Sequence, residues 1–242
     1  MKNKLIAFIL LACLCMAMFS SCSWGRSSVT LGGVVVFGDS YSAFEGYIPE
    51  GFAAYYNDTS ADFGVHSPDK MWWHRLMDKT GSKLLLNSSY SGSTVCHTGY
   101  YGDDYSAFSF ISRLDKLIED GFFAENKVDT IVILGGLNDY WAESPRGEIK
   151  YGDFAAEELY SFYPALSYMI SRAKEASPET RIIYVSEEYL PEDMKADIRE
   201  ICLYYGADVV EIHDISKING HPDKKGMKAI AEQIVEYLEA KE

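Results

Sequence analysis

Five short apolar segments alternate with helical patterns along this chain, and the alternation limits its possible folds more than any other feature. The segments are rich in β-branched and aliphatic residues and show little polar alternation, which is typical of strands buried on both faces of a parallel sheet. The repeated alternation predicts a doubly wound domain with three layers, α/β/α, around a five-stranded parallel sheet. The expected strands are residues Val34–Phe37, Leu84–Leu86, Thr130–Leu134, Arg181–Ser186 and Ala207–Ile212.

The helical patterns place apolar residues on one face of each expected helix. The clearest begins at Met227 and ends at Leu238, where apolar residues recur at i, i+3, i+4, i+7, i+8 and i+11. No linker, repeat or low-complexity block interrupts the sequence of residues 31–242, so we expect one domain there. The other helices are expected around residues Trp72–Met77, Ile111–Ile118, Leu159–Ala176 and Met194–Tyr205.

The composition excludes several classes of protein. With 48% hydrophobic and 24% charged residues, the chain is typical of a folded globular protein. The net charge of -14 argues against nucleic acid or an anionic lipid surface as a partner, because both need clustered Lys and Arg. The sequence contains no CxxC motif and no Cys/His cluster, so it predicts no metal site. These features are compatible with a neutral small-molecule or glycan ligand, and they leave the oligomeric state open.

The N-terminal residues have the pattern of a targeting segment. Lys2 and Lys4 precede an apolar stretch that runs from Leu5 to Phe19. A basic start followed by a short apolar core and small residues is typical of a secretory signal. The stretch is also short for a helix that spans a bilayer, which needs about 20 apolar residues. We therefore expect export.

The end of this segment resembles the lipobox of bacterial lipoproteins, in which a cysteine is lipid-modified and becomes the mature N-terminus. Small residues stand directly before Cys22, although Phe19 replaces the usual Leu. The sequence thus predicts a signal peptide at residues 1–21, a tether at 22–30 and a domain at 31–242 that is anchored to the cell envelope. The anchor is then the expected contact with a membrane. A soluble periplasmic or secreted protein, with an incidental thiol at Cys22, is the alternative.

The cysteine count changes if this processing occurs. Cys96 and Cys202 are then the thiols left in the folded domain. They lie far apart in the sequence, and nothing requires them to form a disulfide.

Polar motifs follow the predicted strands at the carboxyl edge of the sheet, where doubly wound domains bind their ligands. Taken alone, each motif fits a turn or a helix cap. Together they bring a serine hydroxyl, a histidine that can act as a base near neutral pH, and several N–H donors to one edge. This combination of groups is suited to acyl transfer. The motifs are Gly38-Asp39-Ser40, residues 87–94, Gly136-Leu137-Asn138-Asp139 and His221-Pro222.

In this order, the four motifs resemble the conserved blocks of the SGNH subgroup of the GDSL hydrolases. The resemblance implies a flavodoxin-like SGNH hydrolase fold and an acyl-enzyme mechanism without a metal or an organic cofactor. It implies that Ser40 is the nucleophile and that His221 is the base. The backbone amides of Ser40 and Gly92 and the side chain of Asn138 are the implied oxyanion donors.

Two positions depart from the pattern of that family. Tyr41 stands where the nucleophile block usually has Leu, and Ile218 stands three residues before His221, where the family usually has an Asp that orients the imidazole. Asp214 is a candidate for that role, although it fits equally well as a structural acid at the end of the fifth strand. Asp223 and a backbone carbonyl are the other candidates, so the third partner stays open.

Three aromatic-rich segments are expected to surround the same edge, namely Phe44–Asp69, Tyr100–Phe110 and Tyr140-Trp141. Their rings suit stacking on sugars or packing around an acyl chain, and mutual packing within the domain is the alternative. His97, close in sequence to Gly92, is a further candidate for the site.

The favoured function is hydrolysis of carboxylic esters, with the removal of acyl and especially acetyl groups from carbohydrate as the expected reaction. Lipase and thioesterase activities occur on the same scaffold, because a fold does not select a substrate. A catalytically weak glycan-binding lipoprotein is a further alternative. It would explain the missing Asp, but it is disfavoured because Ser40, Gly92, Asn138 and His221 are all present. A flavodoxin-like carrier is disfavoured because no positive charge lies near the first loop.

Overall fold

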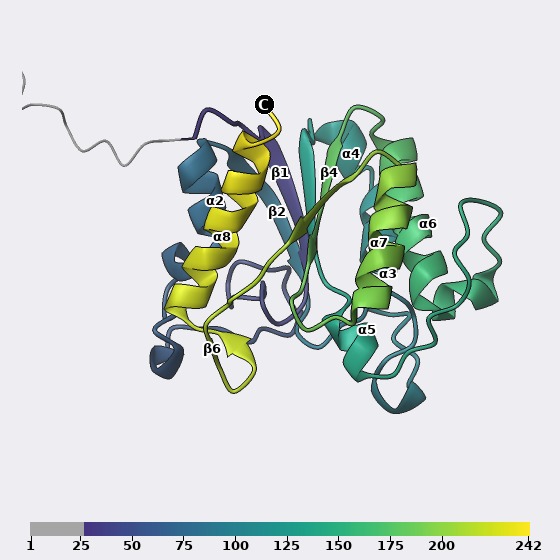
Figure 1. Cartoon of the computed structure of the whole chain (residues 1–242), viewed down its shortest axis with the longest axis horizontal. Helices are drawn as coiled ribbons and strands as arrows, with labels where there is room; N and C mark the ends of the chain where they lie inside the picture. Colours follow the sequence, from purple (N-terminus) through teal and green to yellow (C-terminus); the bar gives the residue numbers. More distant parts are fainter. Residues whose placement is uncertain (1–26) are drawn as a thin grey trace, which may run out of the picture.

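Five parallel strands form the central sheet of the computed structural model, which describes residues 27–242 (Figure 1). Their order is β2-β1-β3-β4-β5, and each strand is parallel to its neighbours. This is the flavodoxin-like order, in which ligands bind at the switch point between β1 and β3. The predicted fold class is confirmed. The strands are β1 (Gly33–Gly38), β2 (Lys83–Ser89), β3 (Thr130–Leu134), β4 (Arg181–Ser186) and β5 (Asp208–Glu211).

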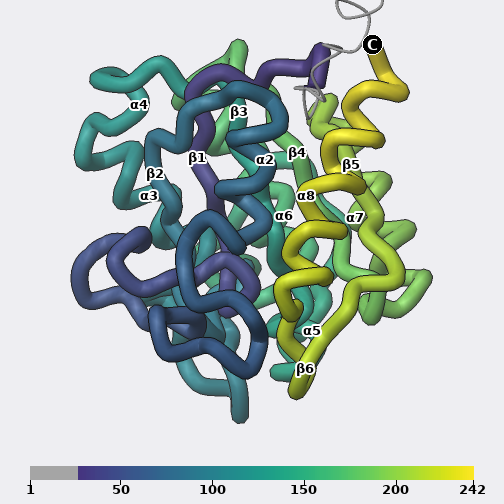
Figure 2. The backbone as a smooth tube through the Cα atoms, turned by 90° about the vertical axis from the view of Figure 1, so that its left-hand side faces the viewer, coloured from purple at the N-terminus to yellow at the C-terminus, as the bar shows by residue number. Residues whose placement is uncertain are grey.

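Helices cover both faces of the sheet and give the three layers. On one face α2 packs against α8, and on the other α6 packs against α3 and α7 (Figures 1 and 2). The bounds are α2 (Trp72–Thr80), α3 (Phe110–Glu119), α6 (Phe162–Ala176), α7 (Glu192–Tyr204) and α8 (Lys224–Glu239). Short turns of helix lie between them: α4 (Phe122–Glu125), α5 (Leu137–Trp141), η1 (Ala61–Phe63), η2 (Pro68–Lys70), η3 (Tyr100–Gly102) and η4 (Ala156–Tyr160).

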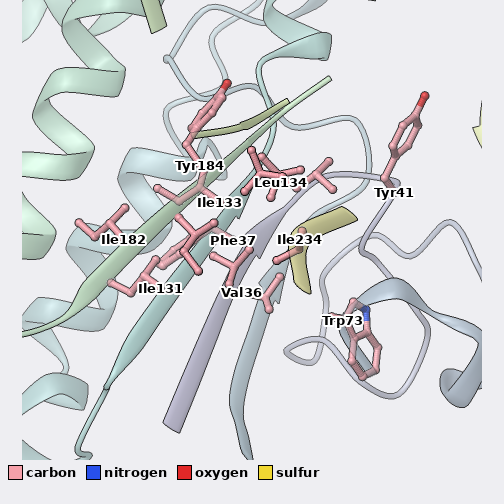
Figure 3. Packing of buried hydrophobic residues seen from close by; sticks show 14 of the residues in the cluster. Val36, Phe37, Tyr41, Trp73, Ile131, Ile133, Leu134, Ile182, Tyr184 and Ile234 are labelled. Carbon is pink, nitrogen blue, oxygen red and sulfur yellow. The ribbon is translucent and has the colours of Figure 1, made fainter. Parts of the chain in front are cut away.

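Apolar side chains of the inner strands fill the centre of the domain (Figure 3). Val36, Ile133 and Ile182, which come from β1, β3 and β4, are completely buried. Trp73 from α2 and Ile234 from α8 belong to the same core. The uninterrupted apolar character of these strands is thus explained by helices on both sides of the sheet.

A buried polar network fixes the turn that follows β1. The indole N–H groups of Trp72 and Trp73 donate to the hydroxyl and to the backbone carbonyl of Ser42, both at 3.0 Å. The side-chain amide of Asn87, at the end of β2, donates to the same carbonyl at 2.9 Å. Helix α2 and strand β2 therefore hold the segment that carries Ser40 from two sides.

The N-terminal end of the described chain packs onto the domain. The Ser27 N–H donates to the Lys79 carbonyl at 2.8 Å, and Val29 is buried in the core. Residues 27–30 were expected to belong to a tether, so the packed domain begins a few residues before residue 31. The expected signal peptide at 1–21 and Cys22 lie outside the described residues. Of the helices that the structure describes, none has the length and apolar character needed to cross a membrane.

Cys96 and Cys202, the two cysteines of the described part of the chain, are both buried free thiols. Burial raises the pKa of the Cys202 thiol to about 12, so this thiol stays protonated and unreactive near neutral pH.

A small hairpin near the C-terminus was not predicted. Strands β6 (Lys217–Ile218) and β7 (His221–Pro222) pair antiparallel, and Ile218 lies opposite His221. The residues between them, Asn219 and Gly220, have φ values of 49° and 79°. Positive φ at both central positions is the requirement of a type I′ turn, which Asn-Gly satisfies well. The hairpin and α5 lie at the same end of the molecule as the loops after β1 (Figures 1 and 2).

Candidate active site

Ser40 and His221 meet at the carboxyl edge of the sheet, although 181 residues separate them in the sequence. Ser40 lies in the turn directly after β1, and His221 begins β7. The distance from the serine Oγ to the imidazole Nε2 is 3.0 Å, which is within hydrogen-bond range. A neutral imidazole at this position can accept the hydroxyl proton and so activate the serine as a nucleophile.

The carboxyl group of Asp39 ties this turn to the neighbouring α5. One oxygen accepts the Tyr41 N–H at 2.9 Å, and the other accepts the Asn138 side-chain amide at 3.3 Å. Burial raises the pKa of Asp39 to about 7, the Glu187 carboxylate adds to this effect, and the guanidinium of Arg113 opposes it. A buried carboxyl group thus orders the turn that presents the nucleophile.

Two backbone N–H groups are available to stabilise an oxyanion. In the described part of the chain, the amides of Ser40 and Gly92 have no hydrogen-bond acceptor. Gly92 has a φ of 81°, a left-handed conformation that a residue without Cβ adopts at little cost. Unpaired N–H donors beside a serine nucleophile are the arrangement that binds the charge of a tetrahedral intermediate.

The side chain of Asn138 reaches the same region, and its orientation is fixed by three contacts. Its amide nitrogen donates to the Ser93 carbonyl at 3.0 Å and, over the longer 3.3 Å distance, to Asp39. Its oxygen accepts the hydroxyl of Tyr100 at 2.7 Å. The weaker contact with Asp39 is therefore the one that an oxyanion can replace when Asn138 donates to it.

The group beside the second imidazole nitrogen is a backbone carbonyl. His221 Nδ1 lies 3.3 Å from the carbonyl oxygen of Asn219, in the turn of its own hairpin. Asp214 is not at this position, because its carboxylate is exposed and lies 3.1 Å from Nδ1 of His213. Asp223 instead caps α8, where it accepts the backbone N–H groups of the first turn. Of the three candidates named from the sequence, the structure places the carbonyl at the imidazole.

A buried ion pair connects the hairpin to the end of β4. The ammonium group of Lys217 lies 2.7 Å from a carboxylate oxygen of Glu187 and 3.1 Å from one of Glu188. The side chains of Lys217 and Glu187 are almost completely buried. This pair was not predicted, because an isolated Glu-Glu dipeptide after a strand and a Lys before a turn are common on protein surfaces.

Arg113 is a second buried charge that sequence reasoning missed. One terminal nitrogen of its guanidinium donates to the Gly38 carbonyl at 3.2 Å and to the Ser93 hydroxyl at 3.0 Å. Its guanidinium carbon also lies 4.5 Å from the centre of the Phe110 ring. Burial lowers the pKa of Arg113 to about 9. The charge lies beneath the nucleophile turn, where it partly neutralises Asp39.

The predicted aromatic segments divide between the site and the surface. From the segment Phe44–Asp69, Tyr55 stacks on the ring of His221, and from Tyr100–Phe110, Tyr100 contacts Asn138. Tyr140 and Trp141 are partly exposed on α5.

His97 belongs to a structural cluster. Its Nδ1 lies 3.0 Å from the hydroxyl of Ser109, which is the N-cap of α3. Within residues 27–242, no group of three or more His, Cys, Asp or Glu side chains could hold a metal ion.

The comparison with known families agrees with this geometry. Residues 32–238 match the family model of the GDSL-like lipase/acylhydrolases. Because the match spans most of the chain, the protein belongs to this family of ester-hydrolysing enzymes. No curated protein matches the chain.

Several solved structures are similar over nearly the whole domain. A GDSL-like lipase from Bacteroides ovatus is 38% identical, with a TM-score of 0.80, and the match covers 87% of this chain and 99% of that one. A GDSL-like lipase from Bacteroides uniformis is 36% identical, with a TM-score of 0.77, over 86% and 96% of the two chains. An acetyl xylan esterase from Butyrivibrio proteoclasticus shares the fold at 16% identity and a TM-score of 0.54, over 88% and 65%.

The roles of His221 and of its candidate partner Asp214 can be tested by substitution. His221→Ala should lower kcat on a simple ester by about 10⁴-fold or more, because the base that activates Ser40 is lost. Asp214→Asn should leave kcat within about twofold of wild type, since it changes an exposed group away from the imidazole. A steady-state assay with p-nitrophenyl acetate measures both. A large loss in Asp214→Asn would show that its carboxylate does reach the imidazole.

The environment of His221 also predicts the pH dependence. Burial lowers the pKa of His221 below its usual 6.5, the positive charge of Lys217 acts in the same direction, and the Asn219 carbonyl opposes both. Only the neutral imidazole accepts a proton, so kcat/KM should rise as pH increases through a midpoint below 6.5 and then level off.

The midpoint is assigned by an NMR titration of the imidazole C–H resonances, which separates His221 from Asp39 with its pKa of about 7. Lys217→Met should move the His221 midpoint upward, because a nearby positive charge is removed. An imidazole midpoint above 6.5 in the wild-type protein would contradict the predicted direction.

Proposed function

We propose that this member of the GDSL-like lipase/acylhydrolase family removes acyl groups, above all acetyl groups, from carbohydrate esters. The observation that carries the proposal is the 3.0 Å contact between Ser40 and His221. In the described part of the chain, the backbone N–H groups of Ser40 and Gly92 are also left without a backbone acceptor. An ester carbonyl placed above Ser40 can thus meet a nucleophile, a base and oxyanion donors together.

The reaction proceeds in two halves. The Ser40 oxygen bonds to the ester carbon while His221 Nε2 takes its proton, and the negative charge that forms on the carbonyl oxygen is bound by the Ser40 and Gly92 amides. His221 then gives the proton to the leaving alkoxide as the C–O bond breaks. Water attacks the acyl-enzyme with His221 again as base, and the acid is released as Ser40 regains its proton.

The carbohydrate part of the proposal is supported by exposed rings at the carboxyl edge of the sheet. Trp141 and Tyr140 lie on the short helix that follows β3, and Tyr189 follows β4. Tyr101, on the loop that also carries Tyr100, is 98% exposed. Aromatic faces bind the C–H faces of sugars, and large exposed rings otherwise have an unfavourable contact with water. The similarity to the acetyl xylan esterase supports only the shared fold and says nothing about the substrate.

The same geometry also serves other esters. Hydrolysis of lipids or thioesters needs the same nucleophile, base and oxyanion donors, with a different surface around them. Binding of glycans with little turnover is favoured by one observation, the carbonyl in place of a carboxylate at His221 Nδ1.

We also propose that the protein is exported and held at the cell envelope by a lipid on Cys22, after removal of residues 1–21. This proposal rests on the sequence pattern alone, because these residues lie outside the described structure. The lipid would be the route to a membrane, and no contact with nucleic acid is expected from a net charge of -14.

Substrate class is tested by comparing an acetylated oligosaccharide with p-nitrophenyl acetate, with Ser40→Ala as the blank. Trp141→Ala should lower kcat/KM about tenfold on the oligosaccharide, because a stacking face is lost, and leave the small ester unaffected. Tyr204→Ala, which removes an exposed ring on α7, is the matched control. Equal effects on both esters would contradict a sugar-binding role for Trp141, and a preference for long-chain p-nitrophenyl esters would favour a lipase.

Anchoring is tested separately by expressing the full chain in a bacterium that processes lipoproteins. Wild type should sediment with membranes, and Cys22→Ser should move the protein to the soluble fraction, because one thiol carries the lipid. Equal distribution of the two proteins would show that Cys22 is no anchor.

A further inference from the structure

Two tyrosine hydroxyls hold the backbone on either side of His221. The hydroxyl of Tyr41 donates to the carbonyl of Gly220 at 2.6 Å, and the hydroxyl of Tyr56 donates to the carbonyl of Pro222 at 2.7 Å. Gly220 directly precedes the histidine in the chain and Pro222 directly follows it. The peptide unit directly before the imidazole-bearing residue and the one after Pro222 are therefore fixed by side chains from the other half of the site.

Both hydroxyls are protected from water and stay protonated. Tyr41 and Tyr56 are buried, and burial raises the pKa of each phenol above its usual value. Each hydroxyl is thus a permanent donor over the pH range in which the enzyme can work. A hydrogen bond inside the protein is also less open to competition from water than one at the surface.

The ring of Tyr55 lies flat against the imidazole. The two ring centres are 3.6 Å apart and the planes differ by 10°, while Tyr41 meets the same imidazole edge-on at 5.4 Å. During turnover His221 carries a proton and becomes positively charged. An aromatic face at this distance attracts a cation, so the Tyr55 ring stabilises the charged form where a carboxylate would otherwise do so.

The three tyrosines lie on the long loop that follows β1 and also carries the nucleophile. The backbone N–H groups of Tyr55 and Tyr56 both donate to the Ala43 carbonyl, at 3.1 and 3.0 Å, which closes the loop after Ser40. The position of the base is consequently set by the same loop that sets the position of the serine. The imidazole itself has only a 3.3 Å contact with a carbonyl at Nδ1, which is a weak constraint alone.

We propose that Tyr41, Tyr55 and Tyr56 act as positioning residues for His221 and together replace the missing carboxylate. The hydroxyls of Tyr41 and Tyr56 fix the hairpin turn, and the ring of Tyr55 orients the imidazole and stabilises its protonated form. This inference rests on ester hydrolysis at Ser40 and is independent of whether the alcohol is a sugar.

The first test removes single hydroxyls. Tyr41→Phe and Tyr56→Phe should each lower kcat on p-nitrophenyl acetate about tenfold, with KM changed less than about twofold, because substrate binding does not involve these groups. Tyr205→Phe is the matched control, since it removes a tyrosine hydroxyl that donates to the Tyr151 carbonyl, at 2.9 Å, in another part of the domain. Thermal melts of all variants establish that they are folded. Unchanged kcat in both Tyr41→Phe and Tyr56→Phe would overturn the role of the hydroxyls.

The second test asks whether the aromatic face of Tyr55 is needed or whether any apolar side chain at this position is sufficient. Tyr55→Phe keeps an aromatic face and Tyr55→Leu removes it, so kcat of the Leu variant should be at least about tenfold below that of the Phe variant. Equal kcat values in the two variants would overturn the contribution of the aromatic face to the charged imidazole.

The third test asks whether the tyrosines act through the histidine. In a His221→Ala background, Tyr41→Phe should change the residual rate by less than about twofold, because the group that it positions is absent. A further tenfold loss in that background would overturn the proposal, since it would show an effect independent of His221.

Labelling of Ser40 by a fluorophosphonate, followed by intact mass, provides a readout that needs no substrate. Tyr41→Phe and Tyr56→Phe should label about tenfold more slowly than wild type, as the same base activates the serine. If wild type labels and these variants label equally fast, the inference alone fails. If wild type neither labels nor cleaves any ester, hydrolysis at Ser40 and the inference fail together. If Ser40 labels and simple esters are cleaved but sugar esters are not, only the proposed substrate class fails.

Discussion

The buried carboxyl of Asp39 lies where the separate parts of the active site join. It accepts hydrogen bonds from the turn that carries the nucleophile and from Asn138 on α5, so the segments after β1 and β3 share one acceptor. Burial would leave such a group strongly disfavoured in its ionised form, and the guanidinium of Arg113 offsets part of that cost. The geometry of the oxyanion donors therefore depends on the balance between the buried charges of Asp39 and Arg113. Loss of the Arg113 charge would disturb the turn that carries Ser40.

The position of the base, His221, depends on a different set of contacts. His221 belongs to a hairpin of only two residue pairs, which is too short to be stable without support. Support comes from Lys217, whose ammonium group is paired with the end of β4, and from the first turn of α8. In that turn, Gly226 lies so close to the backbone of Ser216 that an added Cβ would be 2.2 Å from the Ser216 carbonyl oxygen. Packing of the whole C-terminal segment thus positions one imidazole.

The layers of the fold could be predicted from the sequence, because strands buried on both faces are almost wholly apolar. An example is Thr130–Leu134, which β3 reproduces residue for residue. The meeting of Ser40 and His221 could also be predicted, since motifs after parallel strands share one edge. The hairpin was missed even though Asn219-Gly220 is a strong turn signal, because the flanking strands are too short to show alternation. Contacts such as that of Tyr55 with His221 depend on a long loop whose path no periodicity reports.

The absence of a carboxylate at position 218 is consistent with the charges already present. Ile218 pairs with His221 next to Lys217, whose partner Glu187 itself raises the pKa of Asp39. An Asp at position 218 would add a further negative charge next to Lys217 in the sequence, whose ammonium group is already paired with Glu187 and Glu188. A carbonyl and neutral tyrosines orient the imidazole without adding charge, but they stabilise its protonated form less than a carboxylate does. The consequence is that His221 is a weaker base, which lowers the driving force for proton transfer. In return, a larger fraction of the imidazole is neutral, and therefore active, in mildly acidic water.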